Sequence, residues 1–310
     1  MASLRAGPLD LLHSGREGVI ACYLLDTDDG PALFDCGPTS CLPVLRERLA
    51  EHGVEVGDLR HLLLSHIHLD HAGAAGMLVR EQPALEVHVS ELGAPHLVDP
   101  RRLVASARRL YADAFDALWG ELAPVPEQSI RVTGADVAGL ACFPTPGHAR
   151  HHVSYLDEEG TLYSGDAAGV RLAPARFVLP PLPPPDVDLE AWERTIAETE
   201  LRTPSRLALV HFGVFDDVEE HLARLRETMR RWADWVGHGM DEATFLAAAH
   251  ADLAASDPEA EGDYAHVVPF WHCYAGLERY WRKRAEAEAP PEAGEARSRR
   301  PPRGRAGRRA

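Results

Sequence analysis

The chain has no asparagine and a single lysine, Lys283, so arginine carries almost all of its positive charge. It also has no apolar run near the roughly 18 residues that a membrane-spanning helix needs. A basic stretch followed by an apolar one, typical of a secretory signal peptide, is missing from the first residues. These absences predict a cytoplasmic protein with no membrane association.

Cysteine is scarce as well, with five residues and no Cys-x-x-Cys pair. An odd number without paired spacing predicts reduced thiols rather than a disulfide framework. Cys36 and Cys142 lie near the motifs described below, and we interpret both as small packing residues rather than nucleophiles.

The formal net charge is −16, although the end of the chain from Arg297 onward carries only basic charges. The part before Arg297 is therefore more acidic still and should repel a phosphate backbone. We expect a small-molecule substrate and no nucleic-acid partner. From residue 286 the chain lacks large apolar side chains, so residues 286–310 are predicted to form a disordered, Arg-rich tail.

Hydrophobic patterns predict interleaved strands and helices, followed by helices alone. Strands are predicted at 19–25, 31–35, 62–64, 85–89, 129–132, 139–143, 152–156, 161–164 and 206–211. Helices are predicted at 39–52, 95–119 with a break near Pro100, 188–201, 216–236, 241–255 and 270–284. We therefore expect an α+β catalytic domain over residues 1–215 and a helical C-terminal extension over 216–285.

Four side chains that bind metals in proteins directly follow the apolar run at 62–64: His66, His68, Asp70 and His71. The spacing of two residues lets His66 and His68 point the same way from an extended segment. Imidazole and carboxylate together suit Zn, Mn or Fe(II). A surface cluster of histidines is the alternative, but such density after a buried strand favours a metal site.

Three later residues occupy the same kind of position. His148 follows a Pro-Gly turn, Asp166 follows the strand at 161–164 and a glycine, and His211 ends the strand at 206–211. Each of these is a weak signal alone. Together with the first cluster they predict one metal centre built from strand ends.

In chain order, the segments SHIHLDHAG, PTPGHARHH, YSGDA and ALVHFG resemble the metallo-β-lactamase superfamily. The HLDHAG and PGH forms are similar to the glyoxalase-II-like hydrolases within it, and FDCG at 34–37 matches the family's early Asp-x-Gly turn. The resemblance covers residues 15–215. It implies an αβ/βα sandwich, in which two facing sheets are covered by helices and hold metals at one edge.

The resemblance also implies two divalent metal ions, Zn first, with Fe or Mn as alternatives. The implied ligands are His66, His68 and His148 for one ion, Asp70, His71 and His211 for the other, and Asp166 as the bridge. Asp35 matches a residue that orients ligands by hydrogen bonds. His152 matches a histidine that often follows the PGH turn, with simple packing as an equal alternative.

Two ions about 3.5–4 Å apart can share a water molecule and lower its pKa. The resulting hydroxide would attack an ester, thioester or lactone carbonyl, and Asp70 would pass the proton to the leaving group. Phe212 and Gly213 after the last histidine, and the scarcity of lysine, argue against glutathione as the carrier. The absence of asparagine argues against a β-lactam substrate.

Other functions stay open. The main alternative is a mononuclear iron sulfur dioxygenase that acts on a persulfide. A non-catalytic metal-binding protein and a nuclease of the same fold are less favoured, the first because all seven ligands are present and the second because the chain is acidic. Homodimerisation through the helical part is a further hypothesis.

Two groups of residues are candidates for the substrate pocket. The segment 95–119 is placed to act as a lid and would present Arg101, Arg102, Arg108, Arg109 and Tyr111. A solvated helix face is the competing interpretation of its arginines. The second group comes from the C-terminal aromatics Trp271, His272, Tyr274 and Tyr280, whose alternative role is packing in the helical part.

Overall fold

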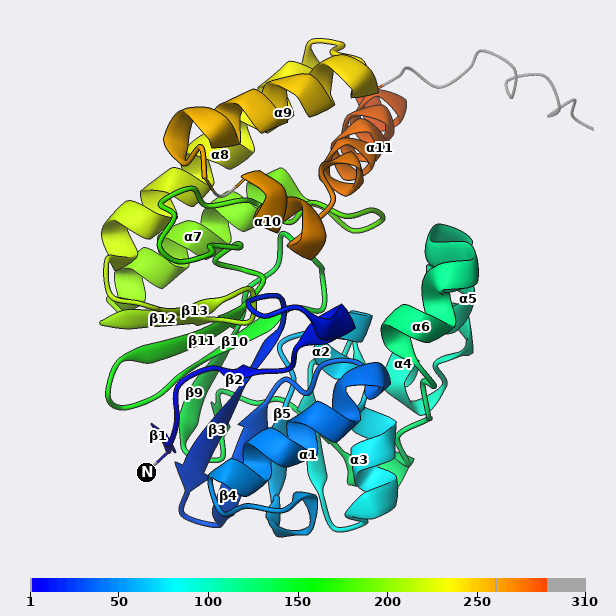
Figure 1. Cartoon of the computed structure of the whole chain (residues 1–310), viewed down its shortest axis with the longest axis vertical. Helices are drawn as coiled ribbons and strands as arrows, with labels where there is room; N and C mark the ends of the chain where they lie inside the picture. The colour runs from blue at the N-terminus through cyan, green and yellow to red at the C-terminus, as the bar shows by residue number, and fades with distance from the viewer. Residues whose placement is uncertain (1, 260, 289–310) are drawn as a thin grey trace, which may run out of the picture.

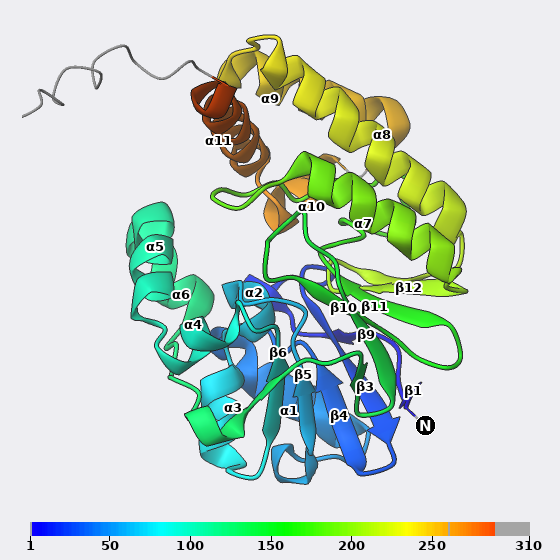
Figure 2. The same ribbon diagram turned by 180° about the vertical axis from the view of Figure 1, so that it is seen from behind.

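A computed structural model describes residues 2–259 and 261–288 of the chain (Figure 1). Two β-sheets face each other, and helices cover their outer sides (Figures 1 and 2). This is the αβ/βα sandwich expected from the sequence. Among the described residues, no helix is long and apolar enough to cross a bilayer.

The first sheet is built from the N-terminal part of the chain and has the order β1-β3-β4-β5-β6-β7, with β2 paired to β3. Its strands are β1 (Ser3–Leu4), β2 (Leu9–Asp10), β3 (Ala21–Thr27), β4 (Gly30–Phe34), β5 (His61–Leu63), β6 (Glu86–Val89) and β7 (Ile130–Val132). The β3–β4 hairpin is antiparallel, and the steps from β4 to β7 are parallel. The carboxyl ends of β4, β5 and β6 therefore share one edge.

The second sheet has the order β13-β12-β11-β10-β9-β8. Its strands are β8 (Asp136–Val137), β9 (Leu140–Pro144), β10 (Val153–Leu156), β11 (Thr161–Gly165), β12 (Arg206–Leu209) and β13 (Gly213–Phe215). β11 and β12 are parallel, and the helix α7 (Leu189–Arg202) connects them. Their carboxyl ends also meet at one edge.

Aromatic residues fill the space between the sheets. The Phe34 ring of the first sheet lies 5.8 Å from the Tyr155 ring and 5.5 Å from the Tyr163 ring of the second. Two hydroxyl groups also link the sheets: Tyr155 donates to the Leu64 carbonyl at 3.0 Å, and Tyr23 donates to the Leu209 carbonyl at 2.6 Å. Both carbonyls lie two residues before a predicted metal ligand, so these bonds fix the two sides of the site relative to each other.

Helices on the first sheet's side are α1 (Leu42–Glu51), α2 (Leu69–Ala72), α3 (Ala75–Glu81), α4 (Ala94–Val98), α5 (Arg101–Tyr111) and α6 (Phe115–Trp119). The helical C-terminal part consists of α8 (Val218–Gly237), α9 (Glu242–Ser256), α10 (Glu261–Val267) and α11 (Phe270–Glu288). It packs on the second sheet through α7, around the fully buried Trp232. The rings of Phe245 and Phe270 from this part, and of Phe177 from the segment before α7, surround that indole.

The predicted elements differ from the structure in several places. α11 continues to Glu288, so residues 286–288 are helical and not part of a disordered tail; the rest of the predicted tail lies outside the described residues. The last predicted strand ends at Leu209, and residues 210–211 lie in the connection to β13. The sequence patterns did not predict β13, α3 or α10, which are short.

Candidate metal centre

All seven predicted ligands lie at one edge of the sandwich, after the carboxyl ends of strands. His66 and His68 follow β5 and lead into α2, which carries Asp70 and His71. His148, Asp166 and His211 follow β9, β11 and β12 in the second sheet. His68 and Asp70 are half-buried, and the other five residues are buried.

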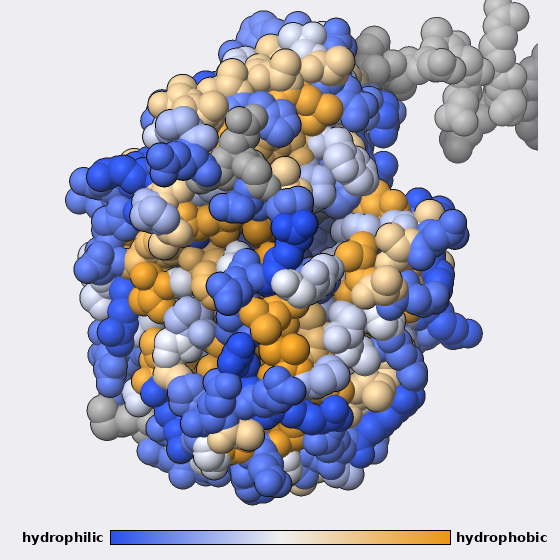
Figure 3. All heavy atoms as spheres, viewed as in Figure 1, coloured by the Kyte–Doolittle hydropathy of each residue, from blue (hydrophilic) through white to orange (hydrophobic). Residues whose placement is uncertain are grey.

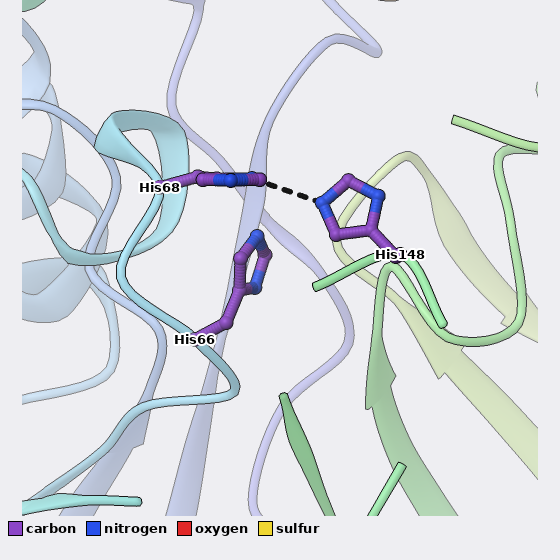
Figure 4. A group of neighbouring side chains, drawn as sticks. All are labelled: His66, His68 and His148. Atoms are coloured by element: carbon purple, nitrogen blue, oxygen red, sulfur yellow. Dashed lines mark hydrogen bonds between the residues drawn. The ribbon is translucent and has the colours of Figure 1, made fainter. Parts of the chain in front are cut away.

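The first cluster comprises His66, His68 and His148, whose rings surround a common point (Figure 4). Nδ1 of His68 lies 2.9 Å from Nε2 of His148. Two nitrogens bound to one zinc ion at 2.0–2.1 Å would be about 3.3 Å apart, so a small adjustment accommodates an ion here. His66 contributes Nε2, which is buried and has no hydrogen-bond partner.

The second cluster comprises Asp70, His71 and His211. Oδ2 of Asp70 lies 3.9 Å from Nε2 of His71 and 3.5 Å from Nε2 of His211. Asp166 lies between the clusters: its Oδ1 is 3.3 Å from Nε2 of His71, and its Oδ2 is 3.2 Å from Nε2 of His148. Its two oxygens therefore face the two clusters separately, as a bridging carboxylate would.

Hydrogen bonds on the far side of each ring turn the remaining nitrogen toward the centre. His148 donates from Nδ1 to the Pro181 carbonyl at 2.8 Å, and His211 donates from Nδ1 to the Val19 carbonyl at 2.6 Å. Such contacts fix the tautomer and orientation of a metal-binding imidazole. In both residues Nε2 faces the centre of the site.

Asp35 orients two further histidines. Its Oδ2 accepts a hydrogen bond from Nδ1 of His71 at 2.8 Å and another from the Ser65 hydroxyl at 2.7 Å. Because the Ser65 proton points to Asp35, the hydroxyl oxygen can accept from Nδ1 of His66, 3.0 Å away. The buried carboxylate of Asp35 thus orients the His71 ring directly and the His66 ring through Ser65.

His152 supports the bridging residue rather than joining either cluster. Its Nε2 accepts a hydrogen bond from the Asp166 backbone at 3.1 Å, and its Nδ1 lies 2.7 Å from the Thr145 hydroxyl. The hydrogen bond with the Asp166 backbone gives His152 a role in positioning Asp166 beyond simple packing. His151 was not singled out by the sequence patterns, yet its ring stacks on His66 with centroids 6.0 Å apart.

The charges of the site are balanced for cation binding. Burial lowers the pKa of His68 to about 3, and burial with neighbouring histidines holds the pKa of His66 well below its ordinary value. Burial opposes protonation of His71 too, but Asp166, Asp70 and Asp35 overcome it and raise its pKa. Three carboxylates thus stabilise a positive charge at His71, and a bound cation would replace its proton, because neutral imidazoles and ionised carboxylates are the forms that bind metals.

If the site binds metal ions, some buried polar atoms should lack hydrogen-bond partners among the described residues. Nε2 of His66, Nε2 of His71 and Oδ1 of Asp166 all lack a hydrogen-bond partner and face the cluster interior. Leaving such groups unpaired in the interior costs about 1–3 kcal/mol each. Two divalent cations would satisfy all three atoms, so the residues present fit two ions.

A pocket of about 680 Å³ opens above the clusters. Its floor includes Asp70 and Asp166, and a hollow is visible between α5 and the C-terminal helices (Figure 3). Its walls are largely apolar and come from four segments: the N-terminal loop at 13–20, α5 and α6, the proline-rich loop at 181–185, and residues 266–272. The site is thus accessible to a small molecule with an apolar part.

The lid residues divide into two groups. Arg109 and Tyr111 of α5 line the pocket. Arg101 instead pairs with Asp99, and Arg108 pairs with Asp116, so both have the solvated role that was the alternative.

Among the C-terminal aromatics, only His272 lines the pocket. Its Nε2 is buried and has no hydrogen-bond partner. Trp271 is 39% exposed, Tyr274 packs against the helical core, and Tyr280 donates to Glu190. Packing in the helical part is therefore the role of Tyr274, whereas Trp271 and Tyr280 lie outside this pocket.

Histidines and carboxylates clustered at the edge of an αβ/βα sandwich define a class of metal-binding proteins. The model of the metallo-beta-lactamase superfamily matches residues 15–213, and the chain belongs to this superfamily. It is 28% identical over 179 residues to a metallo-beta-lactamase fold-containing protein of Sulfurisphaera tokodaii, covering 54% of this chain and 66% of that protein.

Two further similarities differ in extent. The chain is 31% identical over 144 residues to a hydroxyacylglutathione hydrolase of Xanthomonas campestris, covering 46% of this chain and 44% of that protein. A metallo-beta-lactamase family protein of Thermus thermophilus has the same fold, with a TM-score of 0.64 and 19% identity over 92% of this chain and 94% of that one. The chain spans less than two thirds of the length of the Sulfurisphaera and Xanthomonas relatives.

Proposed function

We propose that the chain is a dinuclear metal-dependent hydrolase that cleaves an ester, thioester or lactone bond in a small molecule. The observation that carries the proposal is Asp166, whose two oxygens lie 3.3 Å from His71 and 3.2 Å from His148. Because it faces both clusters, two ions would lie close enough to act on one substrate. The mix of imidazole and carboxylate favours zinc, with iron or manganese as alternatives.

Two bound ions would supply a water molecule of lowered pKa and a Lewis acid for the carbonyl oxygen. The chain supplies the remaining functions. Asp70 is half-buried on the pocket floor, and despite its burial His71 and His211 lower its pKa, so it stays a carboxylate. A carboxylate in this place can accept the proton of the attacking water and return it to the leaving group.

The pocket supports a substrate with an apolar group next to the scissile carbonyl. Leu103, Leu110, Trp119, Val267 and Val268 line its walls. The relative named a hydroxyacylglutathione hydrolase supports a thioester. The near absence of lysine and the partial coverage of that relative favour a different thiol or alcohol as the leaving group.

Metal content measured together with turnover tests the proposal. We expect about two zinc ions per chain by mass spectrometry, and cleavage of aryl esters, acyl thioesters or lactones that stops on chelation and returns with Zn²⁺. A single iron per chain with oxygen uptake on a persulfide would instead support the dioxygenase alternative. Metal-loaded protein inactive toward all of these substrates would contradict both.

A further inference from the structure

A second group of metal-binding side chains lies at the opposite end of β5 from the metal centre. His61 is the first residue of β5, and Glu86 and His88 are on the neighbouring parallel strand β6. His61 pairs with Glu86, and Leu63 pairs with His88. Since residues two apart share a face, His61, Glu86 and His88 all lie on one face of the sheet.

The three donor atoms form a triangle of the size that one ion requires. Nδ1 of His61 is 3.1 Å from Nε2 of His88 and 3.6 Å from Oε2 of Glu86, and the last two atoms are 3.9 Å apart. An ion at the centre of this triangle would be about 2.1 Å from each atom, which is the length of Zn–N and Zn–O bonds. The two nitrogens are spaced much as in the first cluster of the metal centre, where they are 2.9 Å apart.

A hydrogen bond between the two imidazoles explains their 3.1 Å contact but not the position of Oε2 of Glu86, which lies 3.6 and 3.9 Å from the same two nitrogens. Only 7% of the surface of His61 is exposed, and its Nε2 has no hydrogen-bond partner among the described residues. An Nδ1 that accepts a hydrogen bond from His88 leaves the proton on Nε2, as metal binding would, so the state of Nε2 is the same in both explanations. If Nδ1 binds an ion, Nε2 carries the proton and faces Oδ2 of Asp29, 3.9 Å away on an exposed turn. Metal-bound histidines commonly pair with a carboxylate in this way.

Charges around the triangle are compatible with a cation. Arg131 binds Oε1 of Glu86 at 2.8 Å and holds the carboxylate, so that Oε2 faces the two histidines. Burial lowers the pKa of His61 and lowers that of His88 to about 4, so both rings are neutral ligands at neutral pH. Arg131 and Arg60 offset the acidic groups, so an ion should bind here more weakly than at the metal centre.

We propose that His61, His88 and Glu86 bind a further Zn²⁺ ion that links β5 to β6, with Asp29 as the partner of His61. This ion is separate from the hydrolytic chemistry. His61 is the first residue of β5, whereas His66 follows the other end of the strand, up to about 16 Å further along at about 3.3 Å per residue of extended chain. The proposal therefore stands independently of the function proposed above.

Zinc binding by the full chain tests the proposal. The chain is stripped with a chelator and titrated with Zn²⁺ in the calorimeter, and bound metal is measured after dialysis. We expect His88→Ala and Glu86→Gln each to bind one equivalent less than the unmodified chain, with the lost equivalent being the weakest. His238→Ala serves as the control, because this exposed histidine pairs only with Asp234.

The readout is a difference between variants, so it does not depend on how many ions the metal centre holds. Zinc in a crystal, located by anomalous scattering, should give a peak between His61, His88 and Glu86. Equal stoichiometry in all variants, or no peak at a zinc concentration that fills the weakest site, would overturn the proposal. The conservative Glu86→Gln change keeps the test valid if His88→Ala fails to fold.

Discussion

At the residue scale, four of the five imidazoles in the candidate metal centre, all except His68, are oriented by the atom that their second nitrogen contacts. Pro181 and Val19 provide carbonyls, whereas His71 depends on the carboxylate of Asp35. Asp35 is fully buried and has φ of 51°, an unusual conformation for a residue other than glycine. This conformation lets the end of β4 turn its carboxylate toward the site.

Replacing Asp35 tests the importance of this contact. Asp35→Asn keeps the size of the side chain but removes the charge that accepts from His71 and Ser65. We expect metal affinity to fall about 10- to 100-fold, as is typical when such an orienting partner is lost. Competition with a chromophoric chelator measures it. Asp136→Asn, the same change at an exposed position, should leave affinity unchanged; equal loss in both variants would contradict the orienting role.

That the seven candidate ligands lie together could be predicted from the sequence, because each follows the end of a buried strand. Their orienting partners could not all be predicted the same way. The Val19 and Pro181 carbonyls are backbone atoms, which no side-chain pattern marks, and Val19 lies 192 residues before His211. Asp35 was predictable because a side chain carries its role.

At the scale of elements, the turn before His148 depends on close packing against α7. Gly147 has φ of +145°, and a Cβ there would meet the Trp192 backbone at 2.5 Å. The Asp188 backbone also donates to the Gly147 carbonyl at 2.9 Å. The PGH turn is therefore held between the sheet edge and the start of α7, which positions His148.

Gly147→Ala should disturb both folding and the metal centre. The added methyl group would push the turn away from α7, and overpacking of this kind costs about 1–3 kcal/mol. We expect a lower midpoint of thermal unfolding and weaker binding at the His68–His148 pair. Gly57→Ala is the control, since nothing lies within 4 Å of a Cβ at that position. Unchanged stability of Gly147→Ala would show that the contact with α7 is not needed.

Elements were predicted best where the apolar pattern was long and least well where they were short. The β3–β4 hairpin and the helices α7, α8 and α9 match their predicted ranges closely. β13 has only three residues, and it forms because β12 offers an edge to pair with. Such strands depend on the neighbouring structure more than on their own sequence.

At the scale of the whole molecule, the pocket lies between two parts that are distant in sequence. Tyr111 from α5 and His272 from α11 are in ring contact, with centroids 5.8 Å apart. Both residues line the pocket together with Asp70. Which aromatic residues would meet here could not be predicted, because it depends on how the helical part packs.

His272→Ala tests whether the C-terminal wall binds substrate. His272 offers a buried, unpaired Nε2 to the pocket, and a hydrogen bond contributes about 0.5–1.5 kcal/mol. We expect KM to rise about 2- to 10-fold with little change in kcat or in metal content. His238→Ala should have no effect on KM. A fall in kcat alone would instead assign His272 to the chemical step.

The candidate ligands and one wall of the pocket come from different parts of the chain, which affects how substrate preference can evolve. All seven candidate ligands precede residue 212, whereas one wall of the pocket comes from residues 266–272. A genetic exchange between His211 and the start of α8 would therefore replace part of the substrate-binding surface while keeping all seven candidate ligands. Substrate preference in such a lineage can change by recombination, without passing through a form that has lost its reactive centre.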